Sequence, residues 1–297
     1  MDGRAQLASY RAAPLRPPAF AGAVYPGAPA ELRRALDRWL ALPPAASAAP
    51  APPPRLLVAP HIDYPRGAAG YAHAYRALAA SPAELFVVFG TAHATPARPF
   101  TLTRQDYGTP LGPVRTDRAL VDALCAAVGE DALLGDELAH RDEHSVELQA
   151  VILAHRLRRP FTMLPVLCSA IGHLADPAAT TAPFLEALVR AVAGRRVCWV
   201  AAADLAHVGP SYGDPRPPGP AELAALAAAD RRTLRCVEAG DAEGFRREAL
   251  RDAARRRVCG TAPIYAALRA SRAGARLLHY GRWTDGVDSV SFAAAAG

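Results

Sequence analysis

Four short apolar segments, separated by stretches with helical periodicity, constrain the fold of this chain more than any other feature. Each segment is apolar nearly throughout instead of at alternate positions, which is typical of strands that are covered on both faces. The four segments are 55–60 (RLLVAP), 85–90 (LFVVFG), 161–167 (FTMLPVL) and 196–203 (RVCWVAAA). Strands of this kind predict a mainly parallel sheet with helices against both faces.

The stretches around these segments carry apolar residues at helical spacing. The first of them places Leu32, Leu36 and Leu40 on one face of a helix. The alternation of strands and helices places the chain in the α/β class. We predict helices at 29–41, 68–80, 116–128, 143–157, 178–193, 221–238, 242–253 and 262–273.

The length of 297 residues, with 51% hydrophobic residues, allows one large domain or two small ones. We find no internal repeat and no change of composition that would separate two domains. Residues 43–54 (PPAASAAPAPPP) form an alanine- and proline-rich connector that we expect to be extended and exposed. Because too few residues precede it to form a domain, we interpret 1–297 as a single domain that contains this connector.

The net charge of +6 does not indicate a nucleic-acid partner. The chain contains no lysine and no asparagine, and alanine, arginine, glycine and proline dominate, a pattern that follows GC-rich codons. The arginines are scattered along the chain. We interpret their densest run, Arg255–Arg256–Arg257, as a solvated face and not as an anion site.

The cysteines and the chain's apolar runs predict a cytoplasmic protein. The five cysteines show neither a CxxC motif nor paired spacing, so we expect no disulfide framework and a reducing compartment. The N-terminus lacks the basic and apolar regions of a signal peptide. No uninterrupted apolar run is long enough to cross a membrane.

Polar residues directly follow three of the four predicted strands. His61 follows RLLVAP, and His93 follows LFVVFG after a short turn. Asp204 and His207 follow RVCWVAAA. In α/β sheets, ligands bind in the crevice outside the carboxyl ends of the strands. We therefore expect these side chains to converge at one edge of the sheet.

Cys259 opens the segment CGTAP, which leads into a predicted helix. Gly260 permits a tight backbone path, and Thr261 is a candidate helix cap. A thiol just ahead of a helix N-terminus lies at the positive end of the helix dipole, which favours the thiolate that binds metals. Two imidazoles and one thiolate leave coordination positions open, as in reactive metal sites, and they suit zinc, iron(II) or copper.

Each of these residues also has a simpler structural interpretation. A histidine at a strand end is often a hydrogen-bonded structural group, and a lone cysteine is often a small core residue. His144 lies in the motif DEHSVE, which opens a helix with acidic residues in its first turn and with Asp142 as a candidate cap. His144 either faces the crevice or serves only the start of this helix.

The motifs of the chain, taken in order, resemble those of the Memo family, known in prokaryotes as protein B of the AmmeMemoRadiSam system. The resemblance runs nearly from end to end, and the number and order of the motifs make it specific. The matching motifs are FAGAVYPG, APHIDYPRGAAGYAHAY, VVFGTAHA, YGTPLGPVRTD, DEHSVELQ, ADLAHVG, VCGTAPIYAAL and DSVSFAAA.

The resemblance implies a single three-layer α/β/α domain, similar in fold to the catalytic subunit of class III extradiol dioxygenases. It implies that His61, His93 and Cys259 bind the metal and that Asp204 and His207 line the same pocket. The dioxygenases have a carboxylate as the third iron ligand, the usual oxygenase pattern. Because a thiolate changes the electronics of the metal, their ring-cleaving activity does not transfer automatically.

The leading hypothesis is a mononuclear non-haem iron(II) redox enzyme that acts on a small molecule or a peptide. Copper or zinc are the alternative metals. His207 would be a general acid or base, Asp204 would orient it or bind substrate, and His144 would be a second donor to the substrate. Asp63 would accept a substrate donor or orient a ligand; its simpler interpretation is a loop carboxylate paired with Arg66.

Two other function classes are open at this stage. The first is a zinc-type hydrolase, in which the metal lowers the pKa of a bound water and Glu147 or Asp204 is the base. The second is a non-catalytic module that binds a metal or a phosphorylated peptide. The family resemblance also implies a pathway link to a radical SAM enzyme and an AMMECR1-like protein. We expect neither nucleic acid nor a membrane as a partner.

Overall fold

The four predicted strands form the centre of one sheet. They are β1 (Leu56–Ala59), β2 (Leu85–Thr91), β4 (Thr162–Cys168) and β5 (Val197–Ala202). They run parallel in the order β4-β2-β5-β1, so their carboxyl ends meet at one edge. This computed structural model describes residues 3–41, 53–78, 81–94, 96–169 and 171–297. Most of the predicted connector at 43–54 lies outside the described residues.

Four further strands, which the sequence patterns did not predict, extend the sheet with antiparallel pairings. They are β3 (Phe100–Leu102), β6 (Asp204–Val208), β7 (Arg276–Thr284) and β8 (Ser289–Ala296). The full order is β3-β4-β2-β5-β1-β8-β6, and β7 pairs with the other edge of β8. The sheet is therefore mixed, and its parallel part is limited to the four central strands.

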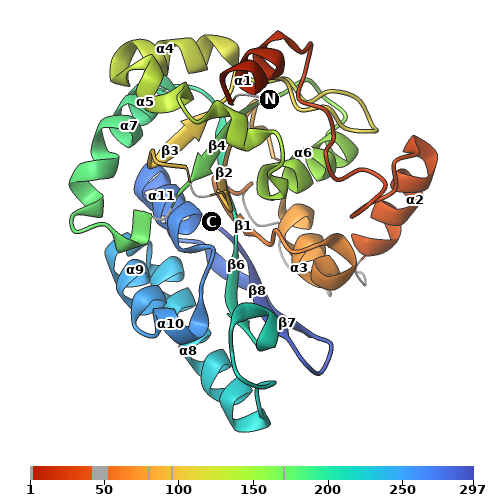
Figure 1. Ribbon diagram of the computed structural model, residues 1–297, viewed down its shortest axis with the longest axis vertical. Coiled ribbons are helices and arrows are strands. Elements are labelled where there is room, and N and C mark those ends of the chain that lie inside the picture. Colours follow the sequence, from red (N-terminus) through yellow and green to blue (C-terminus); the bar gives the residue numbers. More distant parts are fainter. Residues whose placement is uncertain (1–2, 42–52, 79–80, 95, 170) are drawn as a thin grey trace.

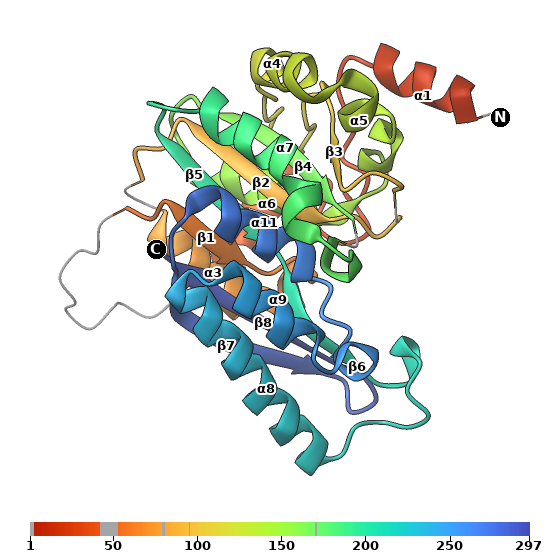
Figure 2. The ribbon, with the colours of Figure 1, turned by 90° about the vertical axis from the view of Figure 1, so that its left-hand side faces the viewer.

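Helices cover both faces of the sheet, as an α/β fold requires (Figures 1 and 2). One hydrophobic cluster joins the sheet to α4, α7, α8, α9 and α11, and a second joins it to α2, α3 and α6. The helices are α1 (Gly3–Ala12), α2 (Pro29–Trp39), α3 (Tyr64–Ala77), α4 (Arg118–Val128), α5 (Glu130–Leu134), α6 (His144–Arg156), α7 (Pro177–Ala191), α8 (Pro220–Ala239), α9 (Ala242–Leu250), α10 (Ala253–Arg256) and α11 (Thr261–Ser271). The 3-10 turns in the described part of the chain are η1 (Glu137–His140), η2 (Ile171–His173) and η3 (Pro210–Tyr212).

The passage from β5 to β6 brings a carboxylate to the edge where the site lies. Ala202, the last residue of β5, pairs with Ala59 at the end of β1. Asp204 pairs with Phe292 of β8, on the other side of β1. Only Ala203 separates the two strands, and its N–H donates to the Ala59 carbonyl at 2.8 Å. The chain thus crosses the carboxyl end of β1 and leaves Asp204 beside the residues that follow it.

The interpretation of Arg255–Arg256–Arg257 as a solvated face was wrong for its middle residue. Arg256 is 2% exposed, and its guanidinium donates to Asp230 at 2.7 Å and to Thr233 at 3.1 Å. Burial of a charge is costly unless it is paired in this way. Only the flanking arginines reach the surface. Among the described residues, no helix is long and apolar enough to cross a membrane.

Candidate metal centre

His61 lies just beyond β1, in a segment that buried side chains hold on both sides. The amide of Gln149 donates to the Pro60 carbonyl at 2.9 Å, and the hydroxyl of Tyr71 donates to the Ile62 carbonyl at 2.8 Å. Both donors are fully buried. The backbone on either side of His61 is therefore fixed by hydrogen bonds that water does not reach.

The hydrogen bonds of His61 decide which of its ring nitrogens is free. Nδ1 lies 2.9 Å from the Ala202 carbonyl oxygen, which can only accept, so Nδ1 carries the proton. Nε2 then presents a lone pair, 3.3 Å from the Cys259 sulfur and 3.6 Å from Asp204 Oδ2. Burial, and then the neighbouring His93, lowers the pKa of His61 to about 3, so the ring is neutral at pH 7.

Glu143 holds His93 in the same way. Its carboxylate accepts the His93 backbone N–H at 2.8 Å and lies 3.0 Å from His93 Nδ1. Burial lowers the pKa of His93, but the hydrogen bond and charge of Glu143 outweigh it, and the net shift is upward. Burial raises the pKa of Glu143, but the hydrogen bond of His93 outweighs it, and the net shift is downward. Both shifts describe an ionised carboxylate that orients the ring and leaves Nε2 free.

Glu143 is the functional residue that sequence reasoning missed. It caps α6 by accepting the Ser145 N–H at 2.9 Å, whereas the predicted cap, Asp142, instead pairs with Arg141 at 2.7 Å. The prediction for Asp142 was therefore wrong by one residue. The position of Glu143 directly before His144 was the only signal that could have identified it, because its contact with His93 is long-range.

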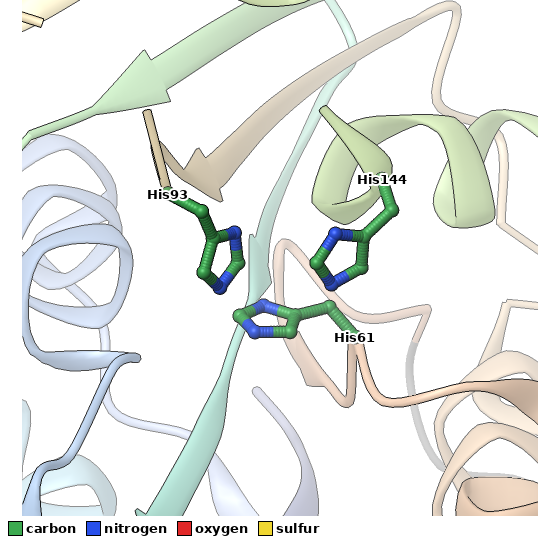
Figure 3. A group of neighbouring side chains, drawn as sticks. All are labelled: His61, His93 and His144. Atoms are coloured by element: carbon green, nitrogen blue, oxygen red, sulfur yellow. The ribbon is translucent and has the colours of Figure 1, made fainter. Parts of the chain in front are cut away.

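His144 faces the crevice. Its ring stacks on His93 with centroids 4.7 Å apart, and it lies nearly perpendicular to the His61 ring with centroids 5.4 Å apart. Figure 3 shows the three rings turned toward one another, from two strand-end loops and the start of α6. Burial, and then the charge of His61, lowers the pKa of His144 to about 3. His144 is therefore neutral at pH 7, and besides opening α6 it places its ring against the other two histidines.

Cys259 lies in the loop before α11 and is tied to two strand ends. Its carbonyl accepts the Thr91 hydroxyl at 3.1 Å, and the Gly260 N–H donates to the Asp204 carbonyl at 3.0 Å. A side chain at position 260 would place its Cβ 2.4 Å from that Asp204 oxygen, so this approach requires glycine. Thr261 does not cap the helix; its hydroxyl donates to the Val258 carbonyl.

The expectation that the start of α11 would favour a thiolate was wrong for the protein by itself. Burial within the crevice, and then the charge of Asp204, raises the pKa of the Cys259 thiol well above its usual value. The protonated thiol can donate to His61 Nε2. A bound cation reverses this balance, because a coordinating thiol is deprotonated.

The donor atoms form two compact groups in the part of the chain that the structure describes. One contains His61, His93 and His144; the other contains His61, Asp204 and Cys259. Within each group, the ligand atoms lie within 4.8 Å of one another. Of the predicted ligands, His93 belongs to the first group and Cys259 to the second. His61 belongs to both.

The other predicted site residues lie around these groups. Asp204 is 1% exposed, and burial raises its pKa to about 6. His207 lies on β6 outside both groups, with Nδ1 3.1 Å from the Leu205 carbonyl, and burial lowers its pKa. Asp63 caps α3 and pairs with Arg66 at 3.1 Å, in agreement with its simpler interpretation.

Glu147 does not face the crevice. Its buried carboxylate pairs with Arg16 and accepts the backbone N–H groups of Ala19 and Phe20 at 3.0 Å and the hydroxyl of Tyr25. These bonds fix the segment that precedes α2 against α6. Glu147 therefore has a structural role, and the hypothesis that it is a base was wrong.

Separate cavities border members of the two donor groups. One, of about 560 Å³, is lined by His93, Glu143 and His144 and by residues of α1 and η1. The other, of about 370 Å³, is lined by Cys259 and Arg257 and by residues of α9 and α10. The larger cavity has the size of a small-molecule site. His93 and His144 are the two imidazoles that line this cavity.

The chemistry of these donors fits a metal ion. Metal-binding histidines usually donate their second ring N–H to a carboxylate or a backbone carbonyl, which orients the ring. His93 does so to Glu143 and His61 does so to Ala202. Nε2 of His61 is therefore already unprotonated, and Nε2 of His93 becomes a ligand when a bound cation displaces its proton. The nearby carboxylate and thiol of Asp204 and Cys259 add donors that a divalent cation accepts.

Comparisons with known proteins give matches to one family. A family model described as "Memo-like protein" matches residues 16–296. The chain is 29% identical to a MEMO1 family protein of Methanosarcina barkeri, over 75% of this chain and 77% of the relative. It is also 29% identical to one of Methanothermobacter thermautotrophicus, over 87% and 88%. A match of 31% identity to one of Methanosarcina mazei spans about half of each chain, 50% and 53%.

Proposed function

Since the chain belongs to the Memo family, we propose that it is a metal-dependent redox enzyme with its centre at the carboxyl ends of β1 and β2. One observation carries the proposal. The Nδ1 atoms of His61 and His93 are each bound to an acceptor, so that both Nε2 atoms are free to bind one cation. The likeness of fold to class III extradiol dioxygenases, which the family resemblance implies, is part of the proposal.

Iron(II) is the metal we propose, with copper or zinc as alternatives. When bound, iron(II) would supply a redox couple and open coordination positions for dioxygen or substrate. Glu143 would keep the His93 ring in one orientation and one tautomer. Gln149 and Tyr71 would hold the backbone around His61 against movement when substrate binds.

Proton transfer is assigned to Asp204 and His207. A carboxylate with a pKa of about 6 exchanges a proton readily near neutral pH, and Asp204 Oδ2 lies 3.6 Å from His61 Nε2. His207 follows on the same strand, and its neutral ring can take or give a proton. The substrate, a small molecule or a peptide, would occupy the cavity of about 560 Å³ beside His93 and His144.

The first experiment is metal analysis by mass spectrometry after anaerobic purification. Wild type should contain iron close to one per chain, and His61→Ala should lose it. His73→Ala is the matched control, since His73 is a half-buried histidine on α3 that stacks on His279 away from the site. Absence of metal from wild type, even after anaerobic reconstitution, would sink the proposal. If wild type binds iron, dioxygen uptake is screened next, and His207→Ala should abolish turnover of a true substrate.

A zinc-type hydrolase is the second candidate, and the buried position of Asp204 beside the donor atoms favours it. Glu147 is paired with Arg16 and Glu143 is bound to His93, so Asp204 is the remaining buried carboxylate beside the donors that could act as base. If the natively purified protein contains zinc and takes up no dioxygen, the hydrolase becomes the leading candidate. A partner that still binds to His61→Ala would instead support a phosphopeptide-binding module. Links to a radical SAM enzyme and an AMMECR1-like protein stay predictions from the family resemblance.

A further inference from the structure

A further cavity lies at the edge of the sheet opposite to the metal centre. Its volume is about 530 Å³, within the range of small-molecule sites. β5 begins beside it at Val197 and ends at Ala202, close to Asp204, so the length of this strand, about 17 Å, separates the two places. None of the donor residues of the metal centre lines this cavity. The proposed function therefore leaves it without a role.

Apolar side chains from three elements line the cavity. They are Trp199 of β5, Val189 and Val192 at the end of α7, and Ala270 near the end of α11. Trp199 is 4% exposed, and its ring stacks on Phe89 of β2 with centroids 6.2 Å apart. The sheet thus holds the indole in place from within the core. A ligand with an apolar body can bury that body against these side chains.

The cavity also carries a strong positive charge. Four arginines line it, and they are Arg55, Arg195, Arg196 and Arg272. In the part of the chain that the structure describes, no aspartate or glutamate is among the lining residues. Arg195 pairs with Asp117 at 2.6 Å, and Arg196 pairs with Glu84. The other two arginines have no ion-pair partner among the described residues, so their guanidinium groups are available to a ligand.

The backbone of Arg272 indicates that its side chain has a use. Arg272 directly follows α11, and its N–H donates to the Leu268 carbonyl at 3.0 Å. Its φ of 52° lies in the left-handed region, where helices usually end with a glycine because a Cβ is disfavoured. Residues held in this region often cluster at ligand sites. An arginine at this position places a charged group at the cavity where glycine would suit the backbone better.

We propose that this cavity binds a small amphipathic anion, in which a carboxylate or phosphate group is attached to an apolar body. Arg55 and Arg272 bind the anionic group, because a guanidinium donates paired hydrogen bonds to carboxylate and phosphate oxygens. Trp199 and the two valines of α7 cover the apolar body. The concave shape and the volume fit a small molecule and not a macromolecule. Binding here requires no metal, so this site is independent of the proposed function.

The test uses the fluorescent anion 8-anilinonaphthalene-1-sulfonate, which carries a sulfonate on an aromatic body, as a probe of the full chain. Wild type should bind the probe with a rise in its fluorescence. Octanoate and octyl phosphate should displace it, whereas octanol and inorganic phosphate at the same concentrations should not, because each lacks one half of the ligand. Equal displacement by octanol would reveal a purely apolar pocket, and displacement by inorganic phosphate would reveal a plain anion site. Either result would overturn the proposal.

Arg272→Gly is the sharpest variant, because it removes a guanidinium and suits the backbone. It should weaken probe binding at least about tenfold, the loss expected for a charge-assisted hydrogen bond, without lowering the midpoint of thermal unfolding. Arg55→Gln should weaken binding by a similar factor. Arg190→Gln is the matched control, since Arg190 lies on α7 outside the cavity and pairs with Glu186 at an exposed position. It should keep the wild-type Kd.

Arg272→Gly should also keep the metal content of wild type, because no donor residue of the metal centre lines this cavity. Failure of this proposal and failure of the proposed function are therefore distinguishable. Wild type that does not bind the probe, unchanged affinity in both Arg272→Gly and Arg55→Gln, or an equal loss in Arg190→Gln would each overturn the assignment of an anion site to this cavity.

Discussion

Replacement of Glu143 by glutamine tests whether the orientation of His93 matters to the metal centre. The carboxylate contacts His93 twice and caps α6 through Ser145. Glutamine has the same shape and keeps one oxygen as an acceptor, so Glu143→Gln removes the charge and leaves the volume unchanged. Glu143→Gln should therefore loosen the orientation of the His93 ring and lower the pKa of His93, while the fold should persist.

The magnitude follows from the role of such partners in other metal sites. Loss of a group that hydrogen-bonds a metal-binding histidine typically weakens metal affinity 10- to 100-fold, or about 1.4–2.7 kcal/mol. The charged hydrogen bonds at 2.8–3.0 Å to His93 place Glu143 in this class. The cost to the helix cap should be smaller, about 1 kcal/mol or less, because the glutamine oxygen can still accept the Ser145 N–H.

The assay is competition between the protein and a chromophoric chelator for zinc at pH 7, paired with urea unfolding of the metal-free protein. Glu137→Gln is the matched control, since Glu137 is a buried carboxylate (2% exposed) that bonds to Arg11 and Thr103 away from the donors. It should lower stability and leave the zinc Kd unchanged. A zinc Kd for Glu143→Gln within twofold of wild type would refute the positioning role.

Three further predictions concern the framework of the site. Arg16→Met leaves the buried Glu147 carboxylate unpaired and should lower the free energy of unfolding by about 3–5 kcal/mol in urea, whereas Arg255→Met, at an exposed pair, should cost under about 1 kcal/mol. His140 is fully buried, and burial lowers its pKa from 6.5 to about 3. Between these pH values the unfolded chain binds a proton at this histidine and the folded chain does not, so the free energy of unfolding falls as the pH falls. His140→Gln should remove about 2 kcal/mol of the stability change between pH 7.5 and pH 5; an unchanged pH profile would contradict this. Gly260→Ala should lower the free energy of unfolding by about 1–3 kcal/mol through overpacking against β6. With cobalt(II) bound to the protein, it should also weaken the absorption band of charge transfer from the Cys259 thiolate to cobalt, and an unchanged band would show that the Cys259 loop tolerates the side chain.

Much of the fold was accessible from local pattern. The strands at 55–60, 85–90, 161–167 and 196–203 were predicted within a residue or two, because continuous apolar runs mark strands that are buried on both faces. The antiparallel strand β8 (SVSFAAAA) was not predicted. Alanine has the highest helix propensity, so only pairing with β1, β6 and β7 makes this segment a strand.

The sequence by itself determined that His61, His93 and Asp204 meet, because residues that follow parallel strands share one edge of a sheet. Tertiary structure decided how they meet. The crossing at Ala203 brings Asp204 beside β1, and the long-range contact of Glu143 with His93 sets which nitrogen is free. Hydrogen bonds between distant segments leave no periodicity in the sequence, so the division of the donors into two groups around His61 could be read only from the folded chain.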